Sequence, residues 1–183
     1  MATVRIDPVL YTEKPKDLVR HQKEMDTYDL LDRLGIGYIR IDHDETPSIE
    51  ACEEVEQILG IEICKNLFLC TANKAHFYLL MMPGNKVFKT KELSRQIGSS
   101  RLSFADASYM EEFLKISPGS VSVLGLMNDT GHNVTLLIDR DVLRNEYVGC
   151  HPCVNTSSLK LRTADLLDKF LPWTGHTPVF VEL

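Results

Sequence analysis

Hydrophobic and polar positions follow two different periods along the chain, and they predict helices interleaved with short strands. From residue 18 to residue 34, mostly apolar side chains recur every three or four positions, which is typical of a helix with one buried face. A second stripe of this kind covers residues 49–59, with Thr46 placed to cap the helix and Pro47 at its first position. Three shorter helices are expected to begin at residues that commonly cap helices: Thr90, Asp106 and Thr163.

Short apolar runs bounded by turn residues predict the strands. The turn sequence at residues 128–131 (Asn-Asp-Thr-Gly) separates two such runs, which therefore predict a β-hairpin. Several neighbouring runs are joined by turns too short for a crossover helix. The sequence thus predicts a mixed α/β fold of the α+β class, with a largely antiparallel mixed sheet and flanking helices. The runs are residues 38–41, 66–71, 76–82, 102–105, 121–127, 134–138, 147–148, 158–161 and 179–181.

Composition and charge exclude several classes of protein. The 183 residues are 44% hydrophobic and 25% charged, which is ordinary for a globular chain and excludes disordered, collagenous and coiled-coil proteins. Twenty Lys and Arg against 26 Asp and Glu give a net charge of -6, so a globally basic nucleic-acid binder is excluded. No apolar run could span a membrane and the first residues lack the apolar stretch of a signal peptide. With five cysteines read as reduced thiols, we expect a cytoplasmic protein with no membrane partner.

Charge is distributed unevenly. Residues 42–56 contain seven acidic side chains and no Lys or Arg, whereas residues 84–102 contain five basic side chains and one acidic one. The basic stretch is either a solvated helix face, which is the commoner case, or a surface that docks phosphates.

The usual chemical motifs are missing. We find no glycine-rich phosphate loop, dinucleotide fingerprint or zinc-protease motif, so no cofactor is expected. Cys150, His151 and Cys153 include metal-ligating types but lack a second Cys/His pair, so buried structural cysteines are favoured over a metal site. A Cys150–His151 nucleophilic pair is disfavoured, because adjacent residues of an extended chain point to opposite sides.

Six short motifs, taken in order, resemble the YbaK/ProX family of aminoacyl-tRNA editing domains. The branch they are most similar to is the freestanding alanyl-tRNA(Pro) deacylase, also called the prolyl-tRNA synthetase associated domain. The match covers residues 24–183 and leaves residues 1–23 as an N-terminal extension. The resemblance implies a mixed sheet partly closed into a barrel, with flanking helices. The motifs are Lys65-Asn66-Leu67-Phe68-Leu69, Arg101-Leu102-Ser103-Phe104-Ala105, Pro118-Gly119-Ser120-Val121, Gly125-Leu126-Met127-Asn128-Asp129, His151-Pro152-Cys153-Val154-Asn155-Thr156 and Thr174-Gly175-His176.

The resemblance also implies an activity, namely hydrolysis of the ester between a tRNA and a wrong amino acid. A site that activates proline cannot strongly exclude the smaller alanine, because missing methylenes cost only about 1–3 kcal/mol. A trans-editing hydrolase of Ala-tRNA(Pro) supplies a second site that admits alanine and rejects proline. A deacylase for Cys- or Ser-charged tRNA, a non-catalytic regulator that binds tRNA or an amino acid, and a metal-binding domain remain alternatives. The implied partner is the acceptor end of tRNA(Pro), with prolyl-tRNA synthetase as a further candidate and DNA excluded.

Individual roles follow from the same resemblance. Lys65 matches the family's pocket lysine and would favour negative charge near the terminal adenosine or the ester carbonyl. His151 would hold the loop or a water molecule, and these two are the implied catalytic residues. No protein nucleophile is expected, since water attacks with help from the ribose hydroxyl beside the ester. The implied substrate-binding residues are Asn66, Asn128, Gly149, Cys150 and Pro152, and the implied tRNA-binding residues are Lys86, Lys89, Arg95 and Arg101.

One segment departs from the family pattern. Members usually carry His-Pro-Pro before the second helix, whereas this chain has Asp-His-Asp-Glu-Thr-Pro at residues 42–47. We expect this acidic segment to line the entrance of the site, and the sequence leaves open whether it lowers activity.

Overall fold

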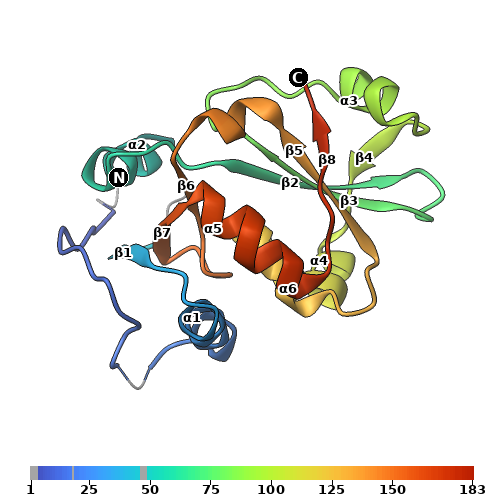
Figure 1. Cartoon of the computed structure of the whole chain (residues 1–183). Helices are drawn as coiled ribbons and strands as arrows, with labels where there is room; N and C mark the ends of the chain where they lie inside the picture. The colour runs from blue at the N-terminus through green and yellow to red at the C-terminus, as the bar shows by residue number, and fades with distance from the viewer. Residues whose placement is uncertain (1–3, 18, 46–48) are drawn as a thin grey trace.

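The strands of the computed structural model, which describes residues 4–17, 19–45 and 49–183, form two separate sheets (Figure 1). The smaller sheet has the order β1-β7-β6 and is antiparallel throughout. The larger has the order β4-β2-β3-β5-β8, in which β2 pairs antiparallel with β3 and β4, while β5 pairs parallel with β3 and β8. The strands are β1 (Tyr38–Asp42), β2 (Lys65–Thr71), β3 (Phe77–Met82), β4 (Leu102–Phe104), β5 (Val134–Asp139), β6 (Tyr147–Cys150), β7 (Ser157–Arg162) and β8 (Val179–Val181).

The mixed α/β architecture expected from the sequence is confirmed, but the expected barrel is wrong. Neither sheet closes on itself, because β1 and β6 end one sheet and β4 and β8 end the other. The sheets meet through an isolated parallel bridge between Ile63 and Gly149, which lies outside the regular strand ladders. One bridge does not provide the continuous hydrogen bonding that a barrel requires.

In the described parts of the chain, four helices of eight or more residues and several short helical turns surround the sheets. None of the helices in the described ranges is long and apolar enough to cross a membrane. The C-terminal turns supply Leu166, Phe170 and Leu171 to the core between the sheets. The helices are α1 (Gln22–Arg33), α2 (Ile49–Leu59), α3 (Thr90–Ile97), α4 (Ala107–Leu114), α5 (Thr163–Asp165) and α6 (Leu171–Thr174), with 3-10 turns η1 (Val123–Asn128) and η2 (Arg140–Arg144) and a π-helical turn η3 (Leu166–Phe170).

The five-stranded sheet is covered on both faces. Phe68 of β2 belongs to the main core, which also contains side chains from α1 and from both sheets. Leu69 belongs to a smaller cluster on the opposite face, together with Leu93 of α3 and Val181 of β8. A sheet buried on both faces has strands with near-continuous apolar runs, as in most of β2, β3 and β5.

The predicted hairpin around residues 128–131 is wrong. Residues 123–128 form the 3-10 turn η1, while β5 pairs with β3 and β8. The Ser122 hydroxyl accepts a hydrogen bond from the Leu124 amide (3.2 Å) and begins the turn. A short, fully buried apolar run has the same sequence pattern in a strand and in a helical turn, so its pattern could not distinguish the two.

The predicted helix starts are approximate. Thr90 and Thr163 are the first residues of α3 and α5, after cap positions held by Lys89 and Arg162. Asp106 holds the cap position of α4, without a side-chain capping bond. Helix α1 begins at Gln22 rather than at residue 18, and the positions of Leu18, Thr46 and Pro47 lie outside the described residues.

The described part of the N-terminal extension pairs with the free edge of β1. Isolated antiparallel bridges join Ile6 to His43 and Tyr11 to Arg40. The amides of Tyr11 and Arg40 donate to each other's carbonyl oxygens at 2.9 and 2.7 Å. This pairing satisfies backbone groups that an exposed edge strand would leave open.

Candidate functional site

The bridge between the sheets brings two of the sequence motifs together. Ile63 pairs with Gly149, and the amide of Cys64 donates to the Gly149 carbonyl at 3.0 Å. Lys65 directly follows Cys64 in the first of these segments, and His151 lies two residues beyond Gly149 in the second. The segments that carry Lys65 and His151 therefore meet at the start of β2 and the end of β6.

Gly149 allows this close approach. A Cβ atom at this position would lie 2.8 Å from Cδ1 of Ile61 and 3.0 Å from the Cα of Ile63. The backbone at Ile63 cannot move aside without breaking the bridge, so a side chain at residue 149 would push the two segments apart.

Lys65 points to the face of the larger sheet that carries α3. Its side chain lies on the same face of the strand as those of Leu67 and Leu69, which belong to the smaller hydrophobic cluster. Lys65 also pairs directly opposite Met82 of that cluster. The partly buried ammonium donates to the carbonyl of Lys86 at 2.8 Å. That carbonyl lies in the connection between β3 and α3, so the lysine is held at the edge of the site.

Lys86 is itself engaged by two carboxylates. Its ammonium lies 2.7 Å from Asp139 and 2.8 Å from Asp141. Burial opposes the charge, yet hydrogen bonds to the two carboxylates raise the pKa of the Lys86 ammonium. Of the four predicted tRNA-binding cations, Lys86 is thus committed to contacts inside the protein, and it fixes the carbonyl that receives Lys65.

Asn66 points to the opposite face, in step with Phe68. Its amide nitrogen donates to the Cys64 carbonyl at 3.2 Å. Its Oδ1 atom is buried and has no hydrogen-bond partner among the described residues. A buried acceptor without a donor is costly, and a ligand that brings an N–H or O–H group would satisfy it.

His151 has one ring nitrogen fixed and one available. Its Nδ1 lies 2.9 Å from the carbonyl oxygen of Ser157, and since a carbonyl only accepts, Nδ1 carries the proton. Burial lowers the pKa of His151. The hydrogen bond to Ser157 acts in the opposite direction, and the neighbouring His43 lowers the pKa further. The ring is therefore neutral, with a lone pair on Nε2. The Ser122 hydroxyl donates to the His151 carbonyl at 2.6 Å and anchors the loop.

His43 joins this cluster, a contact that the sequence did not indicate. It is 6% exposed, and its ring centroid lies 6.3 Å from that of His151. Nδ1 donates to the Asp44 carbonyl at 2.8 Å, so Nε2 accepts from the Ser158 hydroxyl at 2.9 Å. Ser158 also lies 3.5 Å from Nδ1 of His151. The Ser157-Ser158 pair at the start of β7, at positions where the strand is buried, is the signal that could have revealed this arrangement.

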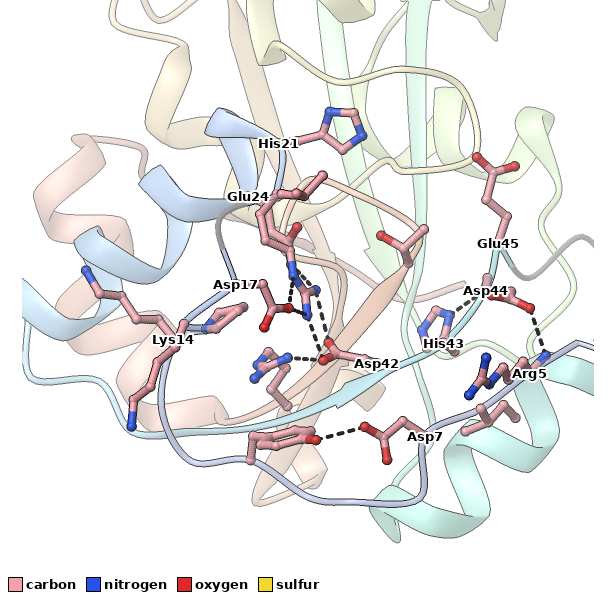
Figure 2. A pocket seen from close by; sticks show the side chains of 18 of the residues that line it. Arg5, Asp7, Lys14, Asp17, His21, Glu24, Asp42, His43, Asp44 and Glu45 are labelled. Atoms are coloured by element: carbon pink, nitrogen blue, oxygen red, sulfur yellow. Dashed lines mark hydrogen bonds and ion pairs between the residues drawn. The ribbon is translucent and has the colours of Figure 1, made fainter.

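A partly buried ion network lies beside the histidines. The guanidinium of Arg20 contacts Asp17 at 2.9 Å, Glu24 at 3.1 Å and Asp42 at 3.0 Å, and Figure 2 shows these three acidic residues close together. The Ser157 hydroxyl donates to Asp42 at 2.7 Å. Burial alone would raise the pKa of Asp42, but hydrogen bonds from Arg20, from the adjacent guanidinium of Arg40 and from Ser157 lower it. The network fastens α1 and the N-terminal extension to Ser157, whose carbonyl orients His151.

A cavity of about 1230 Å³ is lined by residues of the extension, β1 and the start of α1. Asp42, His43, Asp44 and Glu45 line its inner side, and Figure 2 shows the last three grouped beside Arg5. The backbone amide of Arg5 donates to the Asp44 carboxylate at 3.1 Å. The acidic segment thus lies at an opening next to the histidine cluster.

The remaining predicted residues fall outside this cluster or behind it. Asn128 donates to the Leu114 carbonyl at 2.9 Å and ties η1 to α4. Cys150 and Pro152 are buried in the loop, and burial raises the pKa of Cys150, so its thiol is protonated. Across the described ranges, no group of three or more His, Cys, Asp or Glu side chains is arranged to hold a metal ion. The other predicted tRNA-binding cations lie exposed on and around α3: Lys89, Arg95 and Arg101.

Comparisons with known proteins point to one family. A family model described as "Aminoacyl-tRNA editing domain" matches residues 43–169. The prolyl-tRNA editing protein ProX of Acetoanaerobium sticklandii is 33% identical over 153 residues, covering 84% of this chain and 93% of that protein. Prolyl-tRNA synthetase associated domain-containing protein 1 of Danio rerio is 33% identical over 170 residues, covering 91% and 88%.

The fold has solved counterparts. A crystal structure provisionally described as a trans-editing enzyme for prolyl-tRNA synthetase superposes with a TM-score of 0.65 at 16% identity, covering 90% of this chain and 99% of that one. At this identity the likeness concerns the fold alone. The matched range lies inside the domain expected from the sequence motifs, and the resemblance to the YbaK/ProX family is confirmed. The chain belongs to the family of aminoacyl-tRNA editing domains.

Proposed function

We propose that the protein is a trans-editing deacylase that hydrolyses the ester of Ala-tRNA(Pro). Membership of the editing family and the printed names of two relatives support a tRNA-editing role. The observation that carries the proposal is the orphaned, buried Oδ1 of Asn66, three residues beyond the bridge that joins the segments of Lys65 and His151. Lys65 and Asn66 lie on opposite faces of the sheet, but they are the first two residues of β2, so a ligand at the end of the strand would contact both. The end of the strand thus offers an acceptor and a cation beside a neutral imidazole, which suit a charged amino acid esterified to a polyanion.

Each group has a distinct task in the proposed reaction. The Asn66 oxygen accepts a hydrogen bond from the α-ammonium group of the alanyl ester. Lys65 places positive charge near the terminal nucleotide and the ester carbonyl, where negative charge develops. Nε2 of His151 accepts a hydrogen bond from the attacking water and orients it.

The chemistry requires no protein nucleophile. The water oxygen forms a bond to the carbonyl carbon, and the resulting tetrahedral oxyanion expels the ribose oxygen. The proton lost by the water passes to that ribose oxygen, by way of His151 or the neighbouring ribose hydroxyl. The products are free alanine and tRNA with an intact 3′ end.

Contacts with the rest of the tRNA would come from the exposed cations. Lys89, Arg95 and Arg101 form no ion pair with an acidic side chain that the structure describes. We assign them to phosphates of the acceptor stem, where each contact would release condensed counterions. Since charged tRNA is used in translation, we place the protein in the cytoplasm, with prolyl-tRNA synthetase as a candidate partner.

Deacylation assays test the proposal directly. Ala-tRNA(Pro), Pro-tRNA(Pro), Cys-tRNA(Pro) and Ser-tRNA(Pro) are compared as substrates for the wild type, Lys65→Ala, Asn66→Ala and His151→Ala. Lys169→Ala is the matched control, because Lys169 also donates to a backbone carbonyl, that of Gly35 at 3.1 Å, in another part of the molecule. We expect rapid loss of alanine only, with a loss of roughly 10²-fold or more in Lys65→Ala and His151→Ala.

The assay also separates the alternatives. Preferential hydrolysis of the Cys or Ser ester over the Ala ester would change the assigned substrate but support the proposed deacylation reaction. No hydrolysis of any ester by folded wild-type protein, or full activity in Lys65→Ala and His151→Ala, would refute the proposed deacylase.

A further inference from the structure

An exposed aromatic pair lies at the edge of the five-stranded sheet. Phe104 of the edge strand β4 is 63% exposed. The ring of Phe88 packs against the smaller hydrophobic cluster and meets Phe104 edge-on, with centroids 6.3 Å apart. Val87, which is 74% exposed, lies next to Phe88 in the chain. A large aromatic side chain is thus fixed by a neighbouring ring while most of its surface remains in solvent.

The register of the strands places Phe104 on the same face of the sheet as Lys65. Phe104 pairs directly opposite Leu69 of β2. Residues 65, 67 and 69 of one strand share a face, and Lys65 lies four residues before Leu69. At about 3.3 Å per residue, the ammonium site and the aromatic pair are separated by about 13 Å along the strand. One short single strand could reach both.

Three basic residues without a described ion-pair partner surround the aromatic pair. Lys89 follows Phe88 in the chain, Arg101 precedes β4, and helix α3 beside β4 carries Arg95 (Figure 1). None of these three forms an ion pair with a described acidic side chain, whereas the nearby Asp106 is already paired with Lys74 at 3.0 Å. Burying three unpaired cations against an apolar partner would be costly, but against phosphates they would be neutralised.

We propose that Phe104 is a stacking platform for an unpaired base at the 3′ end of the tRNA, upstream of the terminal nucleotide at Lys65. Aromatic side chains stack on any base, and cations beside them hold the backbone, which is the usual way in which single strands are bound. Lys89 and Arg101 contact the phosphates on either side of the stacked base. The proposal rests on the proposed function, because it takes tRNA as the ligand.

Binding measurements with two RNAs test the platform. The probes are a fluorescently labelled tRNA(Pro) transcript with its complete 3′ end and the same transcript without its unpaired 3′ nucleotides. We expect Phe104→Ala to weaken binding of the complete transcript roughly 5- to 150-fold, as for loss of one stacked base, and to leave binding of the trimmed transcript unchanged. Phe104→Trp should restore tight binding. Phe180→Ala is the matched control, since Phe180 is an exposed aromatic on the opposite edge strand, and should bind both transcripts like the wild type.

Fluorescence gives a second readout. Trp173 is the chain's single tryptophan, so a Trp173→Phe background makes Phe104→Trp the only emitter. We expect the complete transcript to quench this emission and the trimmed transcript to leave it unchanged. Equal losses of affinity for both transcripts, or wild-type affinity in Phe104→Ala, would overturn the platform. Concentration-dependent self-association that Phe104→Ala abolishes would also overturn it, because a second copy of the chain would then cover the patch.

The two proposals can fail separately. In steady-state deacylation, Phe104→Ala should raise KM and leave kcat unchanged, because the side chain does not touch the ester. If the wild type shows no deacylation, the proposed function fails while the binding comparison still decides the platform. If deacylation is robust and Phe104→Ala changes neither KM nor tRNA affinity, the platform alone fails.

Discussion

Two charged regions of the molecule differ in how completely their charges are paired. Beside the histidine cluster, Arg20 and Arg40 are surrounded by carboxylates of α1, β1 and the extension. Around α3, by contrast, Lys89, Arg95 and Arg101 lie exposed without a described acidic partner. Paired and buried charges hold elements together, whereas unpaired exposed charges remain available to a ligand. The first region thus holds α1, β1 and the extension together, and we propose the second as a surface for a polyanion.

The largest expected effect comes from breaking the paired region. Arg20→Ala would leave Glu24, which is 1% exposed, without its cation and would remove one of the two cations at Asp42. We expect a loss of about 3 kcal/mol in the free energy of unfolding, as for a buried ion pair that loses one partner. Urea unfolding measures this loss. Arg95→Ala is the control and should change stability by less than about 0.5 kcal/mol, and equal effects of the two substitutions would remove the contrast between the regions.

Lys86 tests the contrast between the two regions. It belongs to the basic stretch of the sequence, but in the structure it is paired with carboxylates. Lys86→Met would leave Asp139, which is 1% exposed, without its cation. We expect a loss of about 2 kcal/mol in the free energy of unfolding and a lower kcat, since the Lys86 carbonyl orients Lys65. Lys86→Arg should restore most of both. Lys91→Met, at an exposed position of α3, is the control, and a Lys86→Met protein that weakens tRNA affinity alone would place Lys86 with the ligand surface.

Protonation of the histidine cluster should reveal the paired region in a milder way. Burial lowers the pKa of His43, against opposing effects of Asp44 and Asp42, so its folded pKa lies below the unfolded value near 6.5. The unfolded state then binds more protons at mildly acidic pH. The stabilising contribution of the neutral ring is complete above the unfolded pKa and is lost as the pH falls through the folded pKa.

Urea unfolding at pH 7.5 and pH 5.5 measures this dependence. We expect the wild type to be less stable at pH 5.5, and His43→Gln to reduce the difference between the two values. His21→Gln is the control, because His21 is exposed at the start of α1. An unchanged pH dependence in His43→Gln would show that protonation of this ring is not linked to unfolding.

The same comparison explains what the sequence could and could not predict. Strands β2 and β3 and helix α3 follow from local patterns, because their periods and turn residues are set by nearby positions. The segment at residues 121–127 was predicted as a strand because a buried apolar run carries no period. The barrel was inferred by family resemblance, and its closure depends on contacts between sheets that no local pattern records.

The candidate site divides in the same way. Lys65, Asn66 and the loop around His151 were identified from motifs, and the bridge between Ile63 and Gly149 joins the two segments that carry them. His43 and Ser158 meet although 115 residues separate them, and Lys86 meets Asp139 across 53 residues. Nothing in a run of basic residues distinguishes a cation with a buried partner from one without. That distinction arises only when β3 and β5 pair.

Substitutions of the unpaired cations around α3 should have the smallest effect on stability. They should also have the clearest effect on tRNA binding. Reversing Lys89 and Arg95 to glutamate should change the free energy of unfolding by less than about 0.5 kcal/mol, because both side chains are exposed and have no described acidic partner. Binding of tRNA should weaken most at low salt. The slope of log K against log salt concentration should fall by about 0.7 to 0.9 for each phosphate contact removed.

A salt titration of tRNA affinity for the wild type and the double variant measures this slope. The control reverses Arg144 and Arg162, two exposed arginines that already contact acidic neighbours, Asp141 at 3.1 Å and Glu146 at 3.6 Å. If both double variants lower affinity and slope equally, tRNA responds to the net charge of the protein and α3 has no special part. If only the variant on α3 does so, the unpaired cations mark the binding surface, since the two double variants change the net charge by the same amount.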